Sequence, residues 1–231
     1  MAKAEKNKKV NQSERIAVSS IGEAVSKVVE YTETKKRKFV ESIDLAINLG
    51  IDSKQSDQNV RGAVLLPHGS GKDVKVAVFT ADEAKIKEAK DAGATLAGLE
   101  DLVKDVQEGK IAFDCCIATP DVMSKIGKIA KVLGPRGLMP SPKNGSVTAD
   151  VKKAVEEALK GKVNFKNDKA GVIHCLVGKS DFSAENLAEN IKEVLKTLKG
   201  SRPESAKGKF IKKVYLSATM SPSVEIIAED I

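Results

Sequence analysis

Aromatic residues are scarce in this 231-residue sequence, which has six Phe, two Tyr and no Trp. Proteins that bind single-stranded nucleic acid without regard to sequence stack successive bases on aromatic rings. So few rings, spread over the whole chain, cannot easily supply such a platform. The scarcity therefore argues against a ring-studded sheet as the main functional surface.

Cysteine and histidine are also rare, with three Cys and two His. Cys115 and Cys116 are adjacent, which disfavours a bridge between them, and Cys175 has no partner at CxxC spacing. We expect all three to be small buried side chains in a reducing compartment. His68 and His174 lie far apart in the sequence, so we predict neither a metal site nor a catalytic triad.

Long apolar runs are absent, so we expect no membrane-spanning helix. The first nine residues are rich in lysine and lack the apolar core of a signal peptide, which favours a solvated basic tail on a cytoplasmic protein. No G-x-G-x-x-G follows a predicted strand, and the glycine pair before Lys72 does not complete a phosphate-binding loop. We therefore predict no cofactor.

The net charge of +7 is distributed unevenly along the chain. Residues 1–38 carry +5, residues 39–69 carry −2, residues 70–161 carry +1 and residues 162–231 carry +3. The two ends thus hold most of the excess positive charge, whereas the middle is almost neutral. If the ends fold together, they form the part of the protein that binds a polyanion.

The terminal segments carry the helix and strand signals of an α+β domain. A capping box, Ser20-Ile-Gly-Glu23, predicts a helix to about Thr34, and Ser183 predicts the start of a second helix. Apolar patterns predict strands at Ile43–Leu49, Ala63–Leu66, Val163–Phe165, Gly171–Val177 and Lys209–Ala218. We expect the third and fourth of these to form a hairpin. Neither end alone has enough strands to close a core, so we predict one antiparallel sheet, built from both ends, with helices on one face.

The middle of the chain has the pattern of an α/β unit. Strands at Val74–Phe79 and Asp114–Ala118 precede helix starts at a second capping box, Thr80–Glu83, and at Thr119-Pro120. The expected helices run to about Asp91, over Leu99–Glu108, to about Val132 and over Asp150–Leu159. Alternating strands and helices predict a Rossmann-like parallel sheet covered on both faces. We therefore predict a discontinuous domain of residues 1–68 and 162–231, with an inserted domain of residues 69–161.

Two stretches of chain join the predicted domains. Leu66, Pro67, His68 and Gly69 form the first, and Lys160 and Gly161 form the second. A double linker restrains twisting more than a single one but permits a clam-like opening, so we expect these residues to act as a hinge.

Three segments allow both a structural and a binding interpretation. The loop Leu133–Gly145, with Arg136 and Lys143 as its charges, is either a rigid connector or an exposed basic loop that touches RNA or another protein. The basic run before Phe39 is either a solvated helix end or a site for phosphates and a stacked base. The Thr-Met-Ser-Pro sequence ending at Pro222 is either the end of an edge strand or a recognition edge with hydroxyls and one apolar plug.

Several stretches together resemble a known family, the large-subunit ribosomal protein L-one in its bacterial or organellar form. The matching segments are Ser56–Gly62, Leu66–Gly69, Ala118–Met123, Leu133–Leu138, Asn167–Lys169 and Ser217–Met220. They occur in the family's order and spacing over most of the chain. The resemblance implies a non-enzymatic constituent of the large ribosomal subunit that binds rRNA, forms a mobile stalk beside the tRNA exit site and assists release of deacylated tRNA. It also implies exit-site tRNA as a partner, repression of the protein's own mRNA through its leader, and a monomer off the ribosome.

The resemblance also implies which residues contact RNA. They are Lys38, Phe39, Ser42, Asp168, Lys169, Thr219, Met220 and Ser221, with Arg136 and Lys143 as a possible second contact. Ser42 stands where the family has threonine, and Ser221 stands where it has glycine. Either the backbone at Ser221 tolerates a side chain, or RNA contact there is weakened. The competing hypothesis is a Rossmann-like enzyme acting on a nucleotide or sugar phosphate through the middle of the chain, which is an argument from fold alone.

Overall fold

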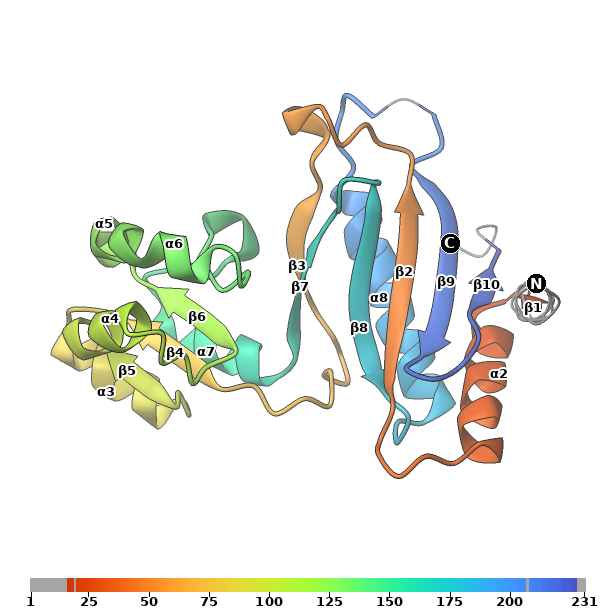
Figure 1. Cartoon of the computed structure of the whole chain (residues 1–231), viewed down its shortest axis with the longest axis horizontal. Helices are drawn as coiled ribbons and strands as arrows, with labels where there is room; N and C mark the ends of the chain where they lie inside the picture. The colour runs from red at the N-terminus through yellow and green to blue at the C-terminus, as the bar shows by residue number, and fades with distance from the viewer. Residues whose placement is uncertain (1–15, 19, 207, 228–231) are drawn as a thin grey trace, which may run out of the picture. The chain divides into compact units, whose positions relative to one another are not determined.

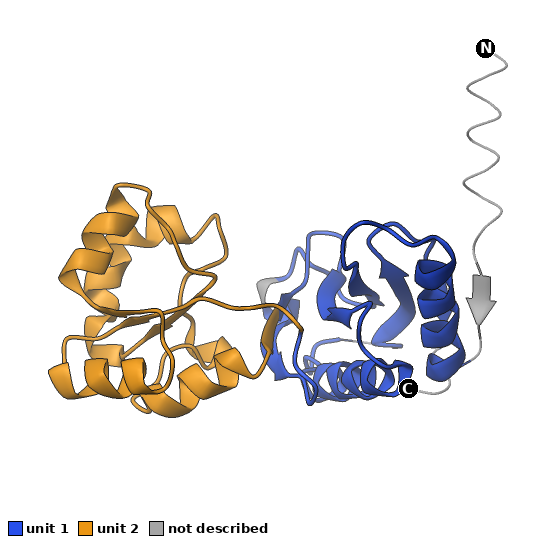
Figure 2. Cartoon of the chain, turned by 90° about the horizontal axis from the view of Figure 1, so that it is seen from below, with its two compact units in different colours: residues 1–70, 165–231 blue, residues 71–164 orange. Residues whose placement is uncertain are grey.

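The computed structural model describes residues 16–18, 20–206 and 208–227 of the chain. The chain divides into two compact units (Figure 2): unit 1 contains residues 1–70 and 165–231, and unit 2 contains residues 71–164. Each unit has its own sheet and its own buried side chains.

Unit 1 is organised around a five-stranded sheet in the order β1-β10-β9-β2-β8 (Figure 1). The strands are β1 (Ile16–Val18), β2 (Ser42–Leu49), β8 (Val172–Lys179), β9 (Ile211–Ala218) and β10 (Val224–Ile226). Neighbouring strands run antiparallel, except that β1 lies parallel to β10. The predicted antiparallel sheet from both ends of the chain is confirmed.

Two long helices cover one face of this sheet. Helix α2 (Ile21–Thr34) begins at Ser20, whose Oγ accepts a hydrogen bond from the amide of Glu23, and α8 (Ala184–Gly200) begins in the same way at Ser183. The two helices contact each other and the strands beneath them. The apolar residues of β2 (Ile43, Leu45, Ile47 and Leu49) are all buried, whereas the residues between them are not. This alternation leaves the other face of the sheet open.

The predicted hairpin is wrong in its pairing. Strand β7 (Lys162–Lys166) pairs with β3 (Arg61–Leu65) in a separate two-stranded sheet, and only one isolated bridge, Asn167 with Ile173, joins it to the β8 segment. The buried Asn167 explains the change of partner. Its side-chain Oδ1 accepts a hydrogen bond from the backbone amide of Val60 at 2.9 Å, and its backbone amide donates to the Val60 carbonyl at 3.1 Å. These bonds hold the end of β7 against the chain that leads into β3.

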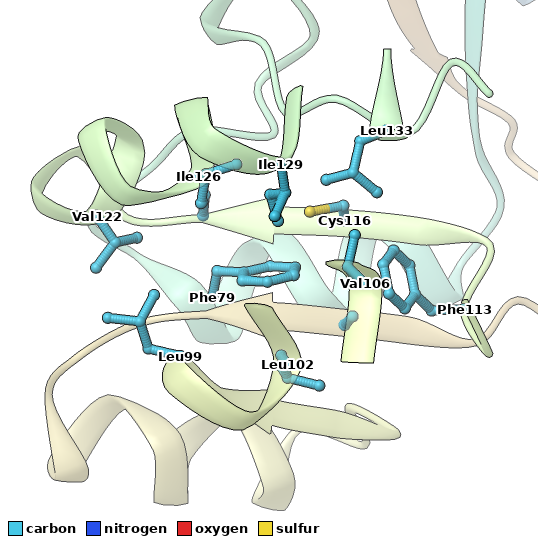
Figure 3. Close-up of a cluster of buried hydrophobic side chains, with 12 residues drawn as sticks. Phe79, Leu99, Leu102, Val106, Phe113, Cys116, Val122, Ile126, Ile129 and Leu133 are labelled. Carbon is cyan, nitrogen blue, oxygen red and sulfur yellow. The ribbon is translucent and has the colours of Figure 1, made fainter. Parts of the chain in front are cut away.

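Unit 2 contains a parallel three-stranded sheet in the order β5-β4-β6, which confirms the predicted parallel sheet. Its strands are β4 (Val76–Phe79), β5 (Leu96–Gly98) and β6 (Cys115–Ala118), and its longer helices are α3 (Glu83–Asp91), α4 (Glu100–Gln107) and α7 (Val151–Leu159). Alternate strand residues enter two cores. Phe79 and Cys116 lie in one, facing α4 and the segment after β6 (Figure 3), and Val78 and Ile117 lie in the other, facing α7. Both faces of the sheet are therefore covered.

Two predicted helices in unit 2 differ from the structure, although the second begins at Pro120 with Thr119 as its N-cap, as predicted. The capping box predicted at Thr80–Glu83 does not form, because Oγ1 of the buried Thr80 accepts a hydrogen bond from the amide of Asp82 instead. Helix α3 begins at Glu83. The single helix expected after Thr119 is divided into four short turns: η2 (Pro120–Val122), α5 (Met123–Ile126), η3 (Gly127–Ile129) and α6 (Ala130–Leu133). A glycine in the middle of this segment lowers its helix propensity, which is consistent with its division.

Bilayer crossing can be assessed for the part of the chain that the structure covers. Within residues 16–18, 20–206 and 208–227, none of the helices combines the length and apolar character that a membrane span requires.

Candidate nucleic-acid interface

The start of β2 and the end of β9 are tied together at one end of the unit 1 sheet. The amide of Ser42 donates to Thr219 Oγ1 at 3.1 Å, and the amide of Thr219 donates to the Ser42 carbonyl at 3.1 Å. Ile43 and Ala218 are opposite each other in the antiparallel register. Two segments that lie 177 positions apart in sequence therefore meet at this end of the sheet, which we call the Ser42–Thr219 edge.

A buried carboxylate supports the same edge. Glu41 is only 4% exposed, and its Oε2 accepts from the amide of Met220 at 2.9 Å. The backbone of Glu41 is fixed by Ser180, which accepts from the Glu41 amide through its Oγ and donates its own amide to the Glu41 carbonyl. Sequence reasoning missed both residues. A lone acidic residue behind a basic run carries no local signal that it is buried.

Two large apolar side chains project from this supported edge. Phe39 and Met220 are each 54% exposed, and Val40 is 45% exposed. Lys36, Arg37 and Lys38 are exposed beside them. A supported surface that combines apolar side chains with cations has the chemistry to contact a base or sugar together with its phosphates.

An open hollow of about 370 Å³ lies beside Phe39. The residues that line it are Thr32, Glu33, Lys36, Arg37, Lys38, Phe39, Val40, Glu41, Ser180 and Asp181. Three of these are basic and three are acidic, so the hollow is mixed in charge. The basic side chains therefore share this hollow with carboxylates, and Phe39 and Val40 provide its apolar lining.

Ser221, which stands in place of the family's glycine, fits its position. Every non-glycine residue within the described ranges has a negative φ, so the backbone here does not require glycine. Ser221 Oγ also accepts from the amide of Ala218 at 2.8 Å, where β9 ends. The backbone at Ser221 therefore tolerates a serine side chain.

The segment that joins β7 to β8, which contains Asp168 and Lys169, lies at the opposite end of the sheet from the start of β2 (Figure 1). Ser42 pairs with Lys179, at the end of β8, and Asn48 pairs with Val172, at its start. Ser42 and Asn48 are six residue steps apart along β2, which corresponds to about 20 Å. The candidate residues therefore form two groups: one around Phe39 and Met220, the other around Asp168.

The Asp168 group forms a rigid turn beside a second hollow. Asp168 Oδ1 accepts from the amides of Ala170 and Val172, both at 2.8 Å, and these backbone bonds lower the pKa of the carboxyl. The hollow has a volume of about 430 Å³. The residues that line it are Ser53, Asn59, Arg61, Lys166, Asn167, Asp168 and Lys169. Arg61 and Lys166, which sequence reasoning did not single out, give this end of the sheet further positive charge.

The open face of the sheet connects the two groups. Asp44, Ala46 and Asn48 follow one another along this face of β2, and the residues opposite them on β9 are Ser217, Tyr215 and Lys213. On the other side, Ala46 is opposite His174 of β8. Partial burial raises the pKa of Asp44, and the neighbouring His174 partly offsets that shift. The face is polar and continuous from Ser42 to Asn48.

The first predicted hinge stretch is anchored to unit 1. Asn190 of α8 is fully buried; its Oδ1 accepts from the amide of His68 at 3.2 Å, and its Nδ2 donates to the carbonyls of Gly69 and Val177. His68 also lies 2.6 Å from Glu189 Oε2. Lys160 and Gly161 of the second stretch follow α7, with Gly161 at a positive φ of 101°. Asn190 was missed because an asparagine within an amphipathic helix normally faces solvent.

Arg136 and Lys143 are both exposed in unit 2. Arg136 lies in the turn after α6, and Lys143 lies in the short η4 (Pro142–Asn144). The loop that carries them is held by its own backbone bonds, including those from Leu138 to Leu133 and from Gly145 to Pro142.

Few of the described side chains are suited to catalysis. Burial raises the pKa of each of the three cysteine thiols, that of Cys175 to about 12, so none is a ready nucleophile. Cys115 and Cys116 are successive residues of β6 and face opposite sides of the sheet. Among the described residues, no three His, Cys, Asp or Glu side chains are grouped closely enough to hold a metal ion.

Comparison with known proteins agrees with the resemblance. Residues 30–222 match the model of the Ribosomal protein L1p/L10e family. The chain is 48% identical over 226 residues to a large ribosomal subunit protein uL1 of Vibrio parahaemolyticus, covering 98% of this chain and 96% of the relative. It is 50% identical over 228 residues to the protein of the same name from Photobacterium profundum, and 49% identical over 226 residues to that from Alcanivorax borkumensis. The chain therefore belongs to the Ribosomal protein L1p/L10e family, a family of ribosomal proteins rather than of enzymes.

Proposed function

We propose that this protein is a structural constituent of the large ribosomal subunit and binds large-subunit rRNA through unit 1. The observation that carries the proposal is the edge where Ser42 and Thr219 are hydrogen-bonded, because it presents Phe39 and Met220 to solvent on a rigid support. The shortage of aromatic residues favours a folded RNA read by its shape, sugars and phosphates over a run of stacked single-stranded bases. The relatives are named as large-subunit proteins, which supports the same conclusion.

The bound RNA extends along the open face of the sheet. Phe39 and Met220 contact it at one end, and Lys169, Arg61 and Lys166 contact its phosphates at the other. The separation of about 20 Å suits a folded stem better than one or two nucleotides. Thr219 acts mainly by holding the first group in place, since its amide and hydroxyl bond to the backbone of Ser42.

The test is the affinity of Phe39→Ala and Met220→Ala, each measured against the rRNA fragment and against a scrambled stem. Loss of a stacked ring typically costs about 1–3 kcal/mol, so Phe39→Ala should weaken rRNA binding by about 5- to 150-fold. Leu159→Ala is the matched control, because Leu159 is an exposed apolar residue of unit 2. Unchanged rRNA affinity in both variants, with correct folding, would contradict the proposed site.

The remaining roles follow from the family resemblance. We propose that the protein forms the mobile stalk beside the tRNA exit site, contacts exit-site tRNA, assists its release and represses translation of its own mRNA by binding the leader. We also propose that the two units are the predicted domains and open about the double linker. Solution scattering with and without the rRNA fragment tests the opening, and one unchanged rigid shape would contradict it.

A further inference from the structure

Unit 2 contains a stretch without acidic residues. Residues 122–149 include five basic residues and no Asp or Glu, whereas residues 71–121 include seven basic and eleven acidic residues. The near-neutral total of the unit therefore hides a separation of charge along its chain. The basic residues are Lys125, Lys128, Lys131, Arg136 and Lys143, which we call the basic set.

Every member of the basic set is exposed and without an acidic partner. Across the residues that the structure describes, no ion pair or side-chain hydrogen bond involves any of the five. Some other lysines of unit 2 are paired locally: Lys85 lies 3.0 Å from Asp82, and Lys110 lies 2.8 Å from Glu108. The charge of the basic set is consequently available to an external anion.

Local structure keeps the first three lysines of the set, Lys125, Lys128 and Lys131, on one side of their segment. The segment mixes single α and 3₁₀ turns, and side chains three residues apart are close to eclipsed in the 3₁₀ geometry. Ile126, Ile129 and Leu133 point into the core, as Figure 3 shows, and fix the segment to the sheet. Lys125, Lys128 and Lys131, spaced by three, remain outside.

The turn that follows places Arg136 on a fixed support. The amide of Gly134 donates to the Ala130 carbonyl at 2.8 Å, and the amide of Gly137 donates to the Gly134 carbonyl at 3.0 Å. Gly137 has a φ of 72°, a conformation that favours glycine. The guanidinium is therefore carried by a defined turn that directly continues the lysine segment.

We propose that the basic set forms a second RNA-binding surface, which holds the phosphate backbone of a folded RNA without reading its sequence. Residues 122–149 contain no Phe, Tyr or Trp, so base stacking has no platform there. Exposed, unpaired cations are the groups that supply sequence-independent affinity for nucleic acid. The inference rests on the proposed function for the class of its ligand, RNA, but uses none of the residues of the unit 1 site.

The experiment compares two triple variants of the full chain, Lys125→Gln/Lys128→Gln/Lys131→Gln and Lys87→Gln/Lys90→Gln/Lys104→Gln. Both remove three exposed lysines of unit 2, and the second set is interspersed with acidic residues. The probe is an RNA duplex of arbitrary sequence, and its affinity is measured over a series of salt concentrations. The slope of log affinity against log salt should fall by about two to three units in the first variant and by less than one in the second.

Equal slopes for the two variants would overturn the proposal. Phe39→Ala separates it from the unit 1 site, because this substitution should reduce discrimination between the rRNA fragment and the duplex while leaving the duplex slope unchanged. A duplex slope that falls with Phe39→Ala and not with the lysine variant would also overturn it. Tighter binding of poly-glutamate than of the duplex at equal charge concentration, lost in the first variant, would favour an acidic protein as the ligand and contradict the assignment to RNA.

Discussion

The amide of Ser42 donates a hydrogen bond to the hydroxyl of Thr219, at 3.1 Å, across 177 positions of sequence. This bond lies between the exposed Phe39 on one segment and the exposed Met220 on the other. It ties the segment that carries Phe39 to the segment that carries Met220. Substitutions that loosen the pair should therefore weaken RNA binding as well as the fold.

Thr219→Val tests this directly. Valine keeps the shape of threonine but removes the oxygen that accepts from Ser42, so the free energy of unfolding should fall by about 1 kcal/mol. RNA affinity should fall at least several-fold. Thr148→Val is the matched control, since Thr148 Oγ1 accepts from the amide of Asp150 in unit 2. Urea unfolding and filter binding give both quantities; equal RNA affinity in the two variants would argue against a positioning role for Thr219.

Substitution of Glu41 should lower both the free energy of unfolding and the affinity for RNA. Glu41→Ala removes the buried carboxylate that accepts from the partly buried amide of Met220, which should cost about 1–3 kcal/mol of stability and also weaken RNA binding. Glu41→Gln retains an oxygen acceptor and should restore most of both. If glutamine behaves like alanine, the carboxylate charge rather than its hydrogen bond is what matters.

Asn190 should contribute far more to folding stability than the exposed contact between His68 and Glu189. Asn190→Leu removes the bonds to His68, Gly69 and Val177, and we expect a loss of at least about 2 kcal/mol, with faster amide exchange at Leu66–Gly69. Glu189→Gln, which removes only the exposed partner of His68, should cost less than about 1 kcal/mol. Similar losses in the two variants would contradict the anchoring role of Asn190.

Asp168 should make folding stability depend on pH in the acidic range. Its carboxyl pKa is lowered in the folded state by the backbone amides of Val172 and Ala170, so its contribution is present above the unfolded pKa, about 4. That contribution is lost as pH falls through the lower folded value. Asp168→Asn should remove this part of the pH dependence. The check is an NMR titration of the carboxyl carbon, together with urea unfolding between pH 2 and 6; an unshifted carboxyl would refute it.

Local signals predicted much of the fold. Ser20 and Ser183 start their helices as expected because a cap depends on residues within one turn. The alternation in β2 identified its buried face for a similar reason. The pairing of β7 with β3 could not be predicted, because it depends on Asn167 bonding to Val60, 107 positions away. Two strands that follow each other in sequence, such as β7 and β8, are normally predicted as a hairpin, and the distant partner β3 has no local signal.

The candidate site was predicted in part. The resemblance identified Phe39, Thr219 and Met220, which the structure places at one edge, but it grouped with them Asp168 and Lys169, which lie at the other end of the sheet. The supporting residues Glu41 and Asn190 were missed, because a polar residue gives no sequence signal of burial when its partners are distant backbone groups. Burial of that kind emerges only once the strands are paired.

Amide hydrogen exchange of the full chain, with and without the rRNA fragment, is the sharpest test of RNA binding through unit 1. We expect RNA to slow exchange at both ends of the unit 1 sheet, at Lys38–Ser42 with Ser217–Ser221 and at Lys166–Lys169, while the helix-covered core strands change little. Protection that is absent from Lys38–Ser42 and Ser217–Ser221 when RNA is bound would contradict it.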